Sequence, residues 1–267
     1  MKSLFGFVLL ILSFFFLSAC SNNGAEQLVL KANNEWVKGR NHGAIEIFKS
    51  VLKQYPSGRP AEESLFRLGE IYHFSLNDSA QAISYFQEVM ELAKKGPFSF
   101  AAQKYIAEIM EFTFKDFEQA IIEYQRLINE FDQPETNGDH QYRIASIYFK
   151  QQNYEQALAE LEILLEDYPK SAWAEETQFK ILEILYTLNR CSDVESHYDK
   201  FIDIYPESKY RNEMTFVIAS CLEDQGMLAE AFNKFKSLQN NYIYPSLLKM
   251  KVEGIEKRMK KKGTLGS

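Results

Sequence analysis

The residue types that most often carry out catalysis are present in this chain, but they are scattered. Ser50 and Lys53 match the Ser-x-x-Lys pattern in which a lysine activates a serine, yet the companion Ser-Asp-Asn and Lys-Thr-Gly elements are absent. The sequence also has no glycine-rich phosphate loop, no Gly-x-Ser-x-Gly elbow and no His-Glu-x-x-His zinc helix. The histidines form no local pair of metal ligands: His42, His73, His140 and His197. We therefore expect that the protein is not an enzyme, and that it has no catalytic residue, no metal site and no cofactor.

One cysteine ends a hydrophobic N-terminal segment. Lys2 is followed by a run of fourteen almost wholly apolar residues, Leu4–Leu17, and the small residues Ser18 and Ala19 then precede Cys20. Fourteen residues are too few to span a bilayer as a stable helix. The segment resembles a bacterial lipoprotein signal with a lipobox, which implies removal of residues 1–19 and lipid attachment at Cys20. The alternative is a buried hydrophobic helix that ends at an ordinary cysteine.

The residues after Cys20 bear on where the protein resides. Ser21, and not aspartate, follows Cys20, and the usual sorting rule for such lipoproteins then favours the outer membrane. Residues 20–24 form a short tether before a first helix that begins near Ala25. Four residues reach about 14 Å even when fully extended. We therefore expect a lipid-anchored protein whose helical body stays near the periplasmic face of the outer membrane.

Two further cysteines, Cys191 and Cys221, would lie in the same oxidising compartment, so a disulfide is one possibility. Cys191 falls in the turn of a helical hairpin, and Cys221 falls on the next helix, two residues after Ala219, where a small core residue fits. Because these positions are expected on different faces, we predict two free thiols.

The elements that must position all these side chains are pairs of helices. Tyr142–Ser171 contains two apolar runs at helical spacing on either side of the polar turn Lys150–Asn153. Ala145 and Ala157 stand twelve residues apart and let the two helices approach closely. This stretch resembles a tetratricopeptide (TPR) repeat.

Copies of this hairpin recur along the chain. The interval from each second-helix small site to the next first-helix site is always 25 residues, and the repeat period is 37 or 38 residues. The extra residue of the longer repeats, the second and third, is expected to lengthen the turn. The small sites are, in the first helices, Ala32, Gly69, Ala107, Ala145, Leu182 and Ala219, and, in the second helices, Ala44, Ala82, Ala120, Ala157, Val194 and Ala231.

The repeats predict the fold class and the domain organisation. We expect an all-α, TPR-like α-solenoid of six helical hairpins over residues 25–262, closed by a C-terminal capping helix over 246–262 and followed by a tail over 263–267. Apolar residues recur at helical spacing in the capping segment: Leu248, Val252, Ile255 and Met259.

Charge is distributed unevenly in this acidic chain, whose formal net charge is −7. Residues 246–267 hold seven basic and two acidic residues, a net of +5. A polar outer surface is what a terminal repeat needs for solubility. Contact with anionic lipid or with an acidic partner is the functional alternative for this basic segment.

A candidate binding surface follows from the helical geometry. Residues three before, one after and four after each first-helix small site should point into the hollow of the solenoid. Aromatic and acidic residues interleave there, which suggests a groove for basic or amphipathic segments of envelope proteins, although the rings could instead pack between repeats. The proposed partner-binding residues are Trp36, Phe66, Tyr142, Phe149, Phe179, Tyr186, Phe216, Glu70, Glu108 and Glu183.

The combination of lipobox, immediate repeats and Tyr-Pro-x-Ser connectors resembles the BamD family of TPR lipoproteins in β-barrel assembly. The connectors are Tyr168–Ser171, Tyr205–Ser208 and, in a shorter form, Tyr55–Ser57. The resemblance implies a membrane-anchored scaffold for protein–protein interaction in outer-membrane protein assembly, with no nucleic-acid partner. Alternatives are a lipoprotein like the type IV pilus pilotins, one related to the Tol-Pal system, and a ligand-binding or enzyme-accessory role in cell-wall metabolism.

Overall fold

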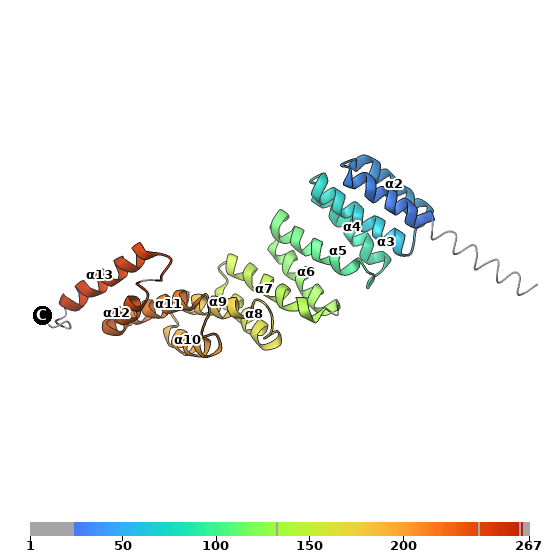
Figure 1. Ribbon diagram of the computed structural model, residues 1–267. Helices are drawn as coiled ribbons and strands as arrows, with labels where there is room; N and C mark the ends of the chain where they lie inside the picture. Colours follow the sequence, from blue (N-terminus) through green and yellow to red (C-terminus); the bar gives the residue numbers. More distant parts are fainter. Residues whose placement is uncertain (1–23, 132, 240, 262, 264–267) are drawn as a thin grey trace, which may run out of the picture. The chain divides into compact units, whose positions relative to one another are not determined.

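The computed structural model describes residues 24–131, 133–239, 241–261 and 263. The expected signal over residues 1–19 and the expected lipid attachment at Cys20 lie outside the described residues. The described chain is helical without strands, and it divides into two compact units at residues 132 and 133 (Figure 1). None of its helices is both long enough and apolar enough to cross a bilayer.

The first unit contains three helical hairpins. A helix over residues 24–37 pairs with α2 (Asn41–Gln54). In the second hairpin, α3 (Arg59–Glu70) continues into the π-helix η1 (Ile71–Ser75) and pairs with α4 (Ser79–Leu92). In the third, α5 (Ser99–Glu108) continues into the π-helix η2 (Ile109–Phe114) and pairs with α6 (Phe117–Glu130).

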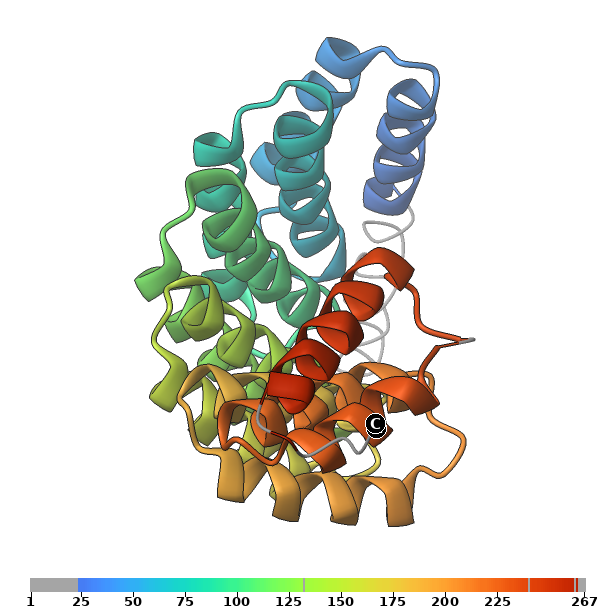
Figure 2. The same ribbon diagram turned by 90° about the vertical axis from the view of Figure 1, so that its left-hand side faces the viewer.

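The second unit contains three hairpins and a closing helix. The pairs are α7 (Pro134–Lys150) with α8 (Tyr154–Asp167), α9 (Ala174–Thr187) with α10 (Cys191–Ile204), and α11 (Arg211–Asp224) with α12 (Leu228–Ser237). The chain then enters α13 (Pro245–Lys261). In each unit the helices of a pair lie side by side (Figure 2). The predicted solenoid of six TPR-like hairpins with a capping helix is confirmed.

The core consists of the residues that recur with the repeat. All twelve small sites are buried, and large residues four places beyond the second-helix sites, such as Phe48, Phe86 and Phe235, are fully buried beside them. The contact is closest in the second hairpin, where a Cβ added to Gly69 would lie 2.5 Å from the ring of Phe86. The small sites therefore let each ring of a second helix reach the backbone of the first helix.

Each hairpin turn contains one residue with left-handed backbone. Only two of the six are glycine, and the set is Gly39, Asn77, Lys115, Gln152, Asn189 and Gly226. Beyond each, a backbone N–H bonds back to the end of the first helix, as Asn153 does to the carbonyl oxygen of Tyr148 at 2.9 Å. This is the pattern of a Schellman helix end, which satisfies carbonyl groups that the helix leaves unpaired.

The extra residue of the second and third repeats lies in the last turn of the first helix, and the connecting turn has the same length as in the other repeats. In those repeats the closing bond spans one more residue, from Asp78 N–H to Tyr72 O at 2.8 Å and from Asp116 N–H to Met110 O at 2.9 Å. The inserted residue is taken up by η1 and η2, because a π-helical turn holds one residue more than an α-helical turn. The expected longer turn was therefore wrong.

Two kinds of contact attach α13 to the end of the second unit. The predicted apolar stripe of α13, from Leu248 to Met259, is buried. On one flank of that stripe, Lys251 and Arg258 donate to the two carboxylate oxygens of Glu223 on α11, at 2.8 and 2.7 Å. The helix thus covers apolar surface that the last hairpin would otherwise leave exposed.

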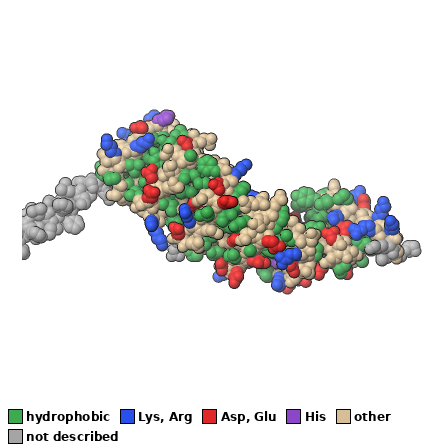
Figure 3. Space-filling view, turned by 180° about the vertical axis from the view of Figure 1, so that it is seen from behind, with side chains coloured by type: hydrophobic (Ala, Val, Ile, Leu, Met, Phe, Trp, Pro, Cys, Tyr) green, Lys and Arg blue, Asp and Glu red, His purple; other side chains and the backbone are tan. Residues whose placement is uncertain are grey.

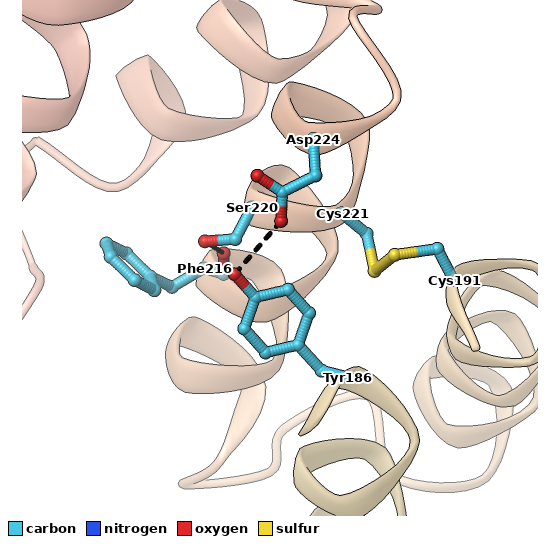
Figure 4. Close-up of a disulfide and its surroundings, with 6 residues drawn as sticks. All are labelled: Tyr186, Cys191, Phe216, Ser220, Cys221 and Asp224. Carbon is cyan, nitrogen blue, oxygen red and sulfur yellow. Dashed lines mark hydrogen bonds between the residues drawn. A yellow bond between two sulfur atoms is a disulfide. The ribbon is translucent and has the colours of Figure 1, made fainter. Parts of the chain in front are cut away.

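The prediction of two free thiols is contradicted, because Cys191 and Cys221 form a disulfide (Figure 4). Cys191 begins α10 and Cys221 lies on α11, with their Cα atoms 5.5 Å apart. Along the sequence, each cysteine belongs to a different hairpin. In the structure, α10 packs against the first helix of the following repeat, which brings the two cysteines together.

Candidate functional site

A small apolar pocket opens between the fourth and fifth hairpins of the chain, both of which belong to the second unit. Its volume is about 190 Å³. Tyr142 and Phe149, two of the predicted groove residues, form part of its wall, and Ala145 lies between them in the sequence and leaves space at the base of the wall. The lining residues are Tyr142, Ala145, Ser146, Phe149, Lys150, Leu161 and Lys180.

Lysine side chains contribute the cationic groups of this pocket. The Lys180 ammonium lies 5.2 Å from the ring centre of Phe149 and 5.8 Å from that of Phe179, within the range of cation–π attraction. It also donates to Glu183 at 2.8 Å. These contacts hold Lys180 beside an apolar wall. The arrangement suits a ligand that offers an apolar side chain with a hydrogen-bond acceptor beside it.

Three of the predicted groove aromatics of the second unit stack on rings of the following repeat. Tyr142 lies 4.2 Å from Trp173 with an interplanar angle of 13°. The same arrangement recurs one repeat later, between Phe179 and Tyr210, at 5.0 Å and 10°. At the last hairpin Phe216 lies 4.8 Å from Tyr242, at 5°. These rings therefore hold successive repeats together, whatever else they contact.

A shared carboxylate reinforces two of these stacks. Glu176, in the first turn of α9, accepts hydrogen bonds from the hydroxyls of Tyr142 at 2.6 Å and Tyr210 at 2.8 Å. Burial alone would raise the pKa of Glu176, but these two hydrogen bonds, with Lys180 and Lys209 nearby, outweigh burial and hold that pKa below its usual value. Burial and the Glu176 charge raise the pKa of the Tyr142 hydroxyl, which therefore stays a donor.

Tyr186 and Phe216 complete the predicted aromatic residues of the second unit. The Tyr186 hydroxyl donates to Asp224 at 3.2 Å, from α9 to α11, close to the disulfide (Figure 4). Phe216 also contacts Phe235, edge to face, at 5.1 Å. Both rings are half-buried, and neither lines the pocket.

The predicted aromatics of the first unit are also involved in packing. Phe66 is buried among Phe86, Phe98 and Tyr105, with ring centres 5.2 to 5.8 Å apart. Trp36 is half-buried, and its indole N–H donates to the hydroxyl of Ser75 at 3.1 Å.

Each of the three predicted acidic groove residues already has a basic neighbour on its own helix. Glu70 is buried, lies 2.5 Å from Arg67, and accepts from the Tyr105 hydroxyl at 3.3 Å. Glu108 lies 3.8 Å from Lys104, and Glu183 pairs with Lys180. The charge of the buried Glu70 is therefore largely compensated. The pairs at Glu108 and Glu183 are partly exposed and contribute little, so selection of a basic segment by these two residues stays a prediction.

The residues that close the pocket from other helices are not among those predicted from the sequence. Lys180 lies on α9 and Leu161 on α8, whereas the prediction considered the exposed face of one first helix at a time. Phe179 is a predicted groove residue, and Lys180 is adjacent to it in the sequence. This adjacency is the one sequence signal that could have indicated Lys180. That the lysine reaches Phe149 on α7 depends on how the hairpins stack.

Solved structures similar to this chain share the repeat fold. A tetratricopeptide repeat protein from Parabacteroides merdae matches with a TM-score of 0.50 and 18% identity, over 90% of this chain and 88% of that one. YrrB, a TPR protein, matches with a TM-score of 0.51 and 12% identity, over 76% and 97% of the two chains. At these identities the similarity shows the fold alone. No curated protein matches the sequence.

Family models place the chain more specifically. A tetratricopeptide repeat model matches residues 62–95, which comprise most of the second hairpin and the start of the connection after it. The YfiO model, described as an outer membrane lipoprotein, matches residues 99–219 and 134–246, which together cover more than half of the chain. The two matches begin 35 residues apart, close to one repeat, so the model fits the solenoid in two registers. The chain therefore belongs to the YfiO family of outer membrane lipoproteins, BamD-like TPR scaffolds for protein interaction in the cell envelope.

Proposed function

We propose that this protein is anchored to the periplasmic face of the outer membrane through lipid on Cys20, and that it holds a segment of another envelope protein during outer-membrane protein assembly. The family and the sequence of residues 1–20 support the location. The BamD-like resemblance supports the pathway. The observation that carries the binding proposal is the apolar pocket lined by α7, α8 and α9.

The size of the pocket indicates what kind of ligand enters it. Pockets for drug-sized ligands and cofactors usually have volumes of about 300 to 1,000 Å³. A volume of about 190 Å³ is below that range, and it suits one apolar side chain of a polypeptide. The Lys180 ammonium lies beside that position, and its partly exposed pair with Glu183 leaves it further donor hydrogens. The bound segment is therefore amphipathic, with an acceptor or a carboxylate next to its apolar anchor.

Filling the pocket tests this assignment. Ser146 lines it and is half-buried, so Ser146→Phe should occupy the space that the anchor needs. A photo-reactive amino acid at Lys150, introduced in cells, should crosslink to an envelope protein, and mass spectrometry should locate the crosslink in an amphipathic segment. Ser146→Phe should reduce this crosslinking at least tenfold, since a buried anchor typically contributes about 2 kcal/mol or more.

The matched control is Ser237→Phe, the same substitution at an exposed position of α12. It should leave crosslinking at Lys150 unchanged. Equal crosslinking in the two variants would contradict the pocket assignment. The anchor is tested separately, because Cys20→Ser should abolish incorporation of labelled palmitate and leave uncleaved precursor.

A further inference from the structure

A second surface, on the outer face of α13, is independent of the pocket. We propose that α13 and the loop before it form a contact site for an anionic lipid bilayer. In this arrangement apolar side chains enter the interface while lysines stay among the headgroups.

The first observation is a group of large apolar side chains that the fold leaves exposed. Ile243 is 62% exposed, Tyr244 58%, Leu247 37% and Met250 60%. At about 100° per residue, Leu247, Met250 and Gly254 fall within one 60° arc, on the side of α13 away from its buried stripe. The first half of the helix is therefore apolar on a second side, which packing against α12 does not explain.

The second observation is the charge that follows these apolar residues along the same helix. α13 contains six basic and two acidic residues. Lys251 and Arg258 are occupied by Glu223, which leaves four exposed lysines: Lys249, Lys257, Lys260 and Lys261. Two of these approach glutamates of α13, Lys249 to Glu253 at 3.8 Å and Lys260 to Glu256 at 3.3 Å, but exposed pairs of this kind contribute little.

The two groups lie in sequence along one helix, with apolar residues near its start and basic residues near its end. Figure 3 shows hydrophobic side chains gathered near the start of α13 and lysine or arginine side chains near its end. A basic helix with exposed Ile, Tyr, Leu and Met side chains is typical of segments that lie in the interface of an anionic bilayer. Tyrosine is favoured at that depth, and long lysines keep their charge in the headgroup layer.

Shape favours a bilayer over an acidic protein as the occupant. The exposed apolar residues stand on a loop and on the outward side of a helix, so they protrude. A protein partner would need a matching hollow for them, whereas a bilayer accepts protruding side chains without one. The contact requires neither the lipid on Cys20 nor the pocket at Ser146, so it can be tested in their absence.

The test uses the chain from Ser21 onward, which lacks the lipid and keeps every described residue. Flotation with vesicles of phosphatidylethanolamine and phosphatidylglycerol should recover the protein, and vesicles of phosphatidylcholine alone should recover much less. Lys257→Glu with Lys261→Glu should lower the partition coefficient at least tenfold at low salt, since each lysine near an anionic surface has a substantial effect. Ile243→Gln with Met250→Gln should lower it about tenfold at low and at high salt.

Matched controls lie elsewhere in the same unit. Lys170→Glu with Lys200→Glu reverses two exposed lysines away from α13, and Ile204→Gln replaces an apolar side chain that is 59% exposed on α10. Both controls, and Ser146→Phe, should bind vesicles like the unmodified chain.

Three outcomes would overturn the lipid proposal. The first is equal recovery with neutral and anionic vesicles, and the second is unchanged binding by both α13 variants, with circular dichroism showing that all chains are folded. The third is binding of polyglutamate through α13 without binding of anionic vesicles, which would identify the surface as a site for an acidic protein.

Discussion

The two units are built from the same repeat, yet two of the three hairpins of the first unit end their first helix in a way that no described hairpin of the second unit does. In the second and third hairpins, one inserted residue forms a π-helical turn, and in the fourth and fifth the α-helix runs to the turn unchanged. In the fourth and fifth hairpins the residue four places after the small site is Phe149 or Tyr186, which is half-buried on the first-helix face. In the second and third hairpins it is His73 or Glu111.

The inserted residue changes which side chains are exposed. His73 is turned toward Ser79, with Nδ1 and Oγ 2.9 Å apart, and Glu111 is buried and accepts from the Tyr124 hydroxyl at 2.9 Å. The next residues in the sequence, Phe74 and Phe112, are instead exposed. A single insertion therefore rotates the end of the helix. The polar residue His73 or Glu111 turns inward, and the aromatic residue that follows it becomes exposed.

The units also differ in what joins their repeats. The first unit joins its second and third hairpins through tilted rings, with Phe66 5.2 Å from Phe98 and 5.8 Å from Tyr105. The second unit has near-parallel ring stacks, the hydrogen bonds to Glu176 and a disulfide. Predictions that affect one unit and spare the other therefore test this comparison. Hydrogen exchange, followed peptide by peptide, can measure each unit separately.

The largest effect should come from the disulfide, which belongs to the second unit alone. Replacing Cys191 by Ser and Cys221 by Ala should lower the free energy of unfolding of that unit by about 2 to 4 kcal/mol, because the bond restricts the unfolded chain over a separation of 30 residues. Exchange should accelerate in α9 to α12 and stay unchanged in residues 24–131. Dithiothreitol should accelerate exchange in the same helices of the unmodified chain and have no effect on the variant. Exchange in the unmodified chain that dithiothreitol does not change would refute the prediction.

An intermediate effect is expected from a methyl group at the close approach in the first unit. Glycine to alanine within a helix normally stabilises by up to about 1 kcal/mol. At Gly69 the added Cβ would overlap the buried ring of Phe86, so Gly69→Ala should instead destabilise the first unit by about 1 to 3 kcal/mol. Denaturant unfolding, together with exchange in α3 and α4, measures the change.

The matched control for this substitution is Gly254→Ala in α13, where an added Cβ meets no atom within 4 Å. It should stabilise the second unit slightly. The close-approach argument is wrong if both alanine variants change stability in the same direction.

The smallest effect should follow from Glu176, whose hydrogen bonds join repeats of the second unit. Because its pKa is lowered in the folded state, its contribution is fully present above the unfolded value of 4.5 and is lost as the pH falls through the lower folded pKa. Glu176→Gln should therefore be slightly less stable than the unmodified chain near pH 7, and the difference should shrink below pH 4.5. Thermal unfolding across this pH range would show it. The neighbouring Glu175→Gln, which keeps the hydrogen bonds of Tyr142 and Tyr210 to Glu176, is the control and should leave the stability near pH 7 unchanged.

Much of the fold could be predicted because the spacing of residue types within each repeat shows how its two helices align. Small residues at fixed spacing fix which helix faces touch, and all twelve sites proved to be buried. The candidate surface was harder to predict. Angular position on one helix shows that Tyr142 and Phe179 leave the hairpin core, but it cannot show whether solvent or the next repeat meets them. The structure places Trp173 and Tyr210 against them.

The sequence by itself determined the hairpins, their number and the apolar stripe of the closing helix, because these depend on residues a few positions apart in one helix or one turn. The tertiary structure decided the pairing of Cys191 with Cys221, the pocket that Lys180 completes and the conversion of an inserted residue into a π-helical turn. The pairing and the pocket depend on distances between successive hairpins. The π-helical turn depends on which hydrogen bonds close the helix end. These distances and hydrogen bonds are set by packing across the whole unit, so a local pattern of residue types cannot predict them.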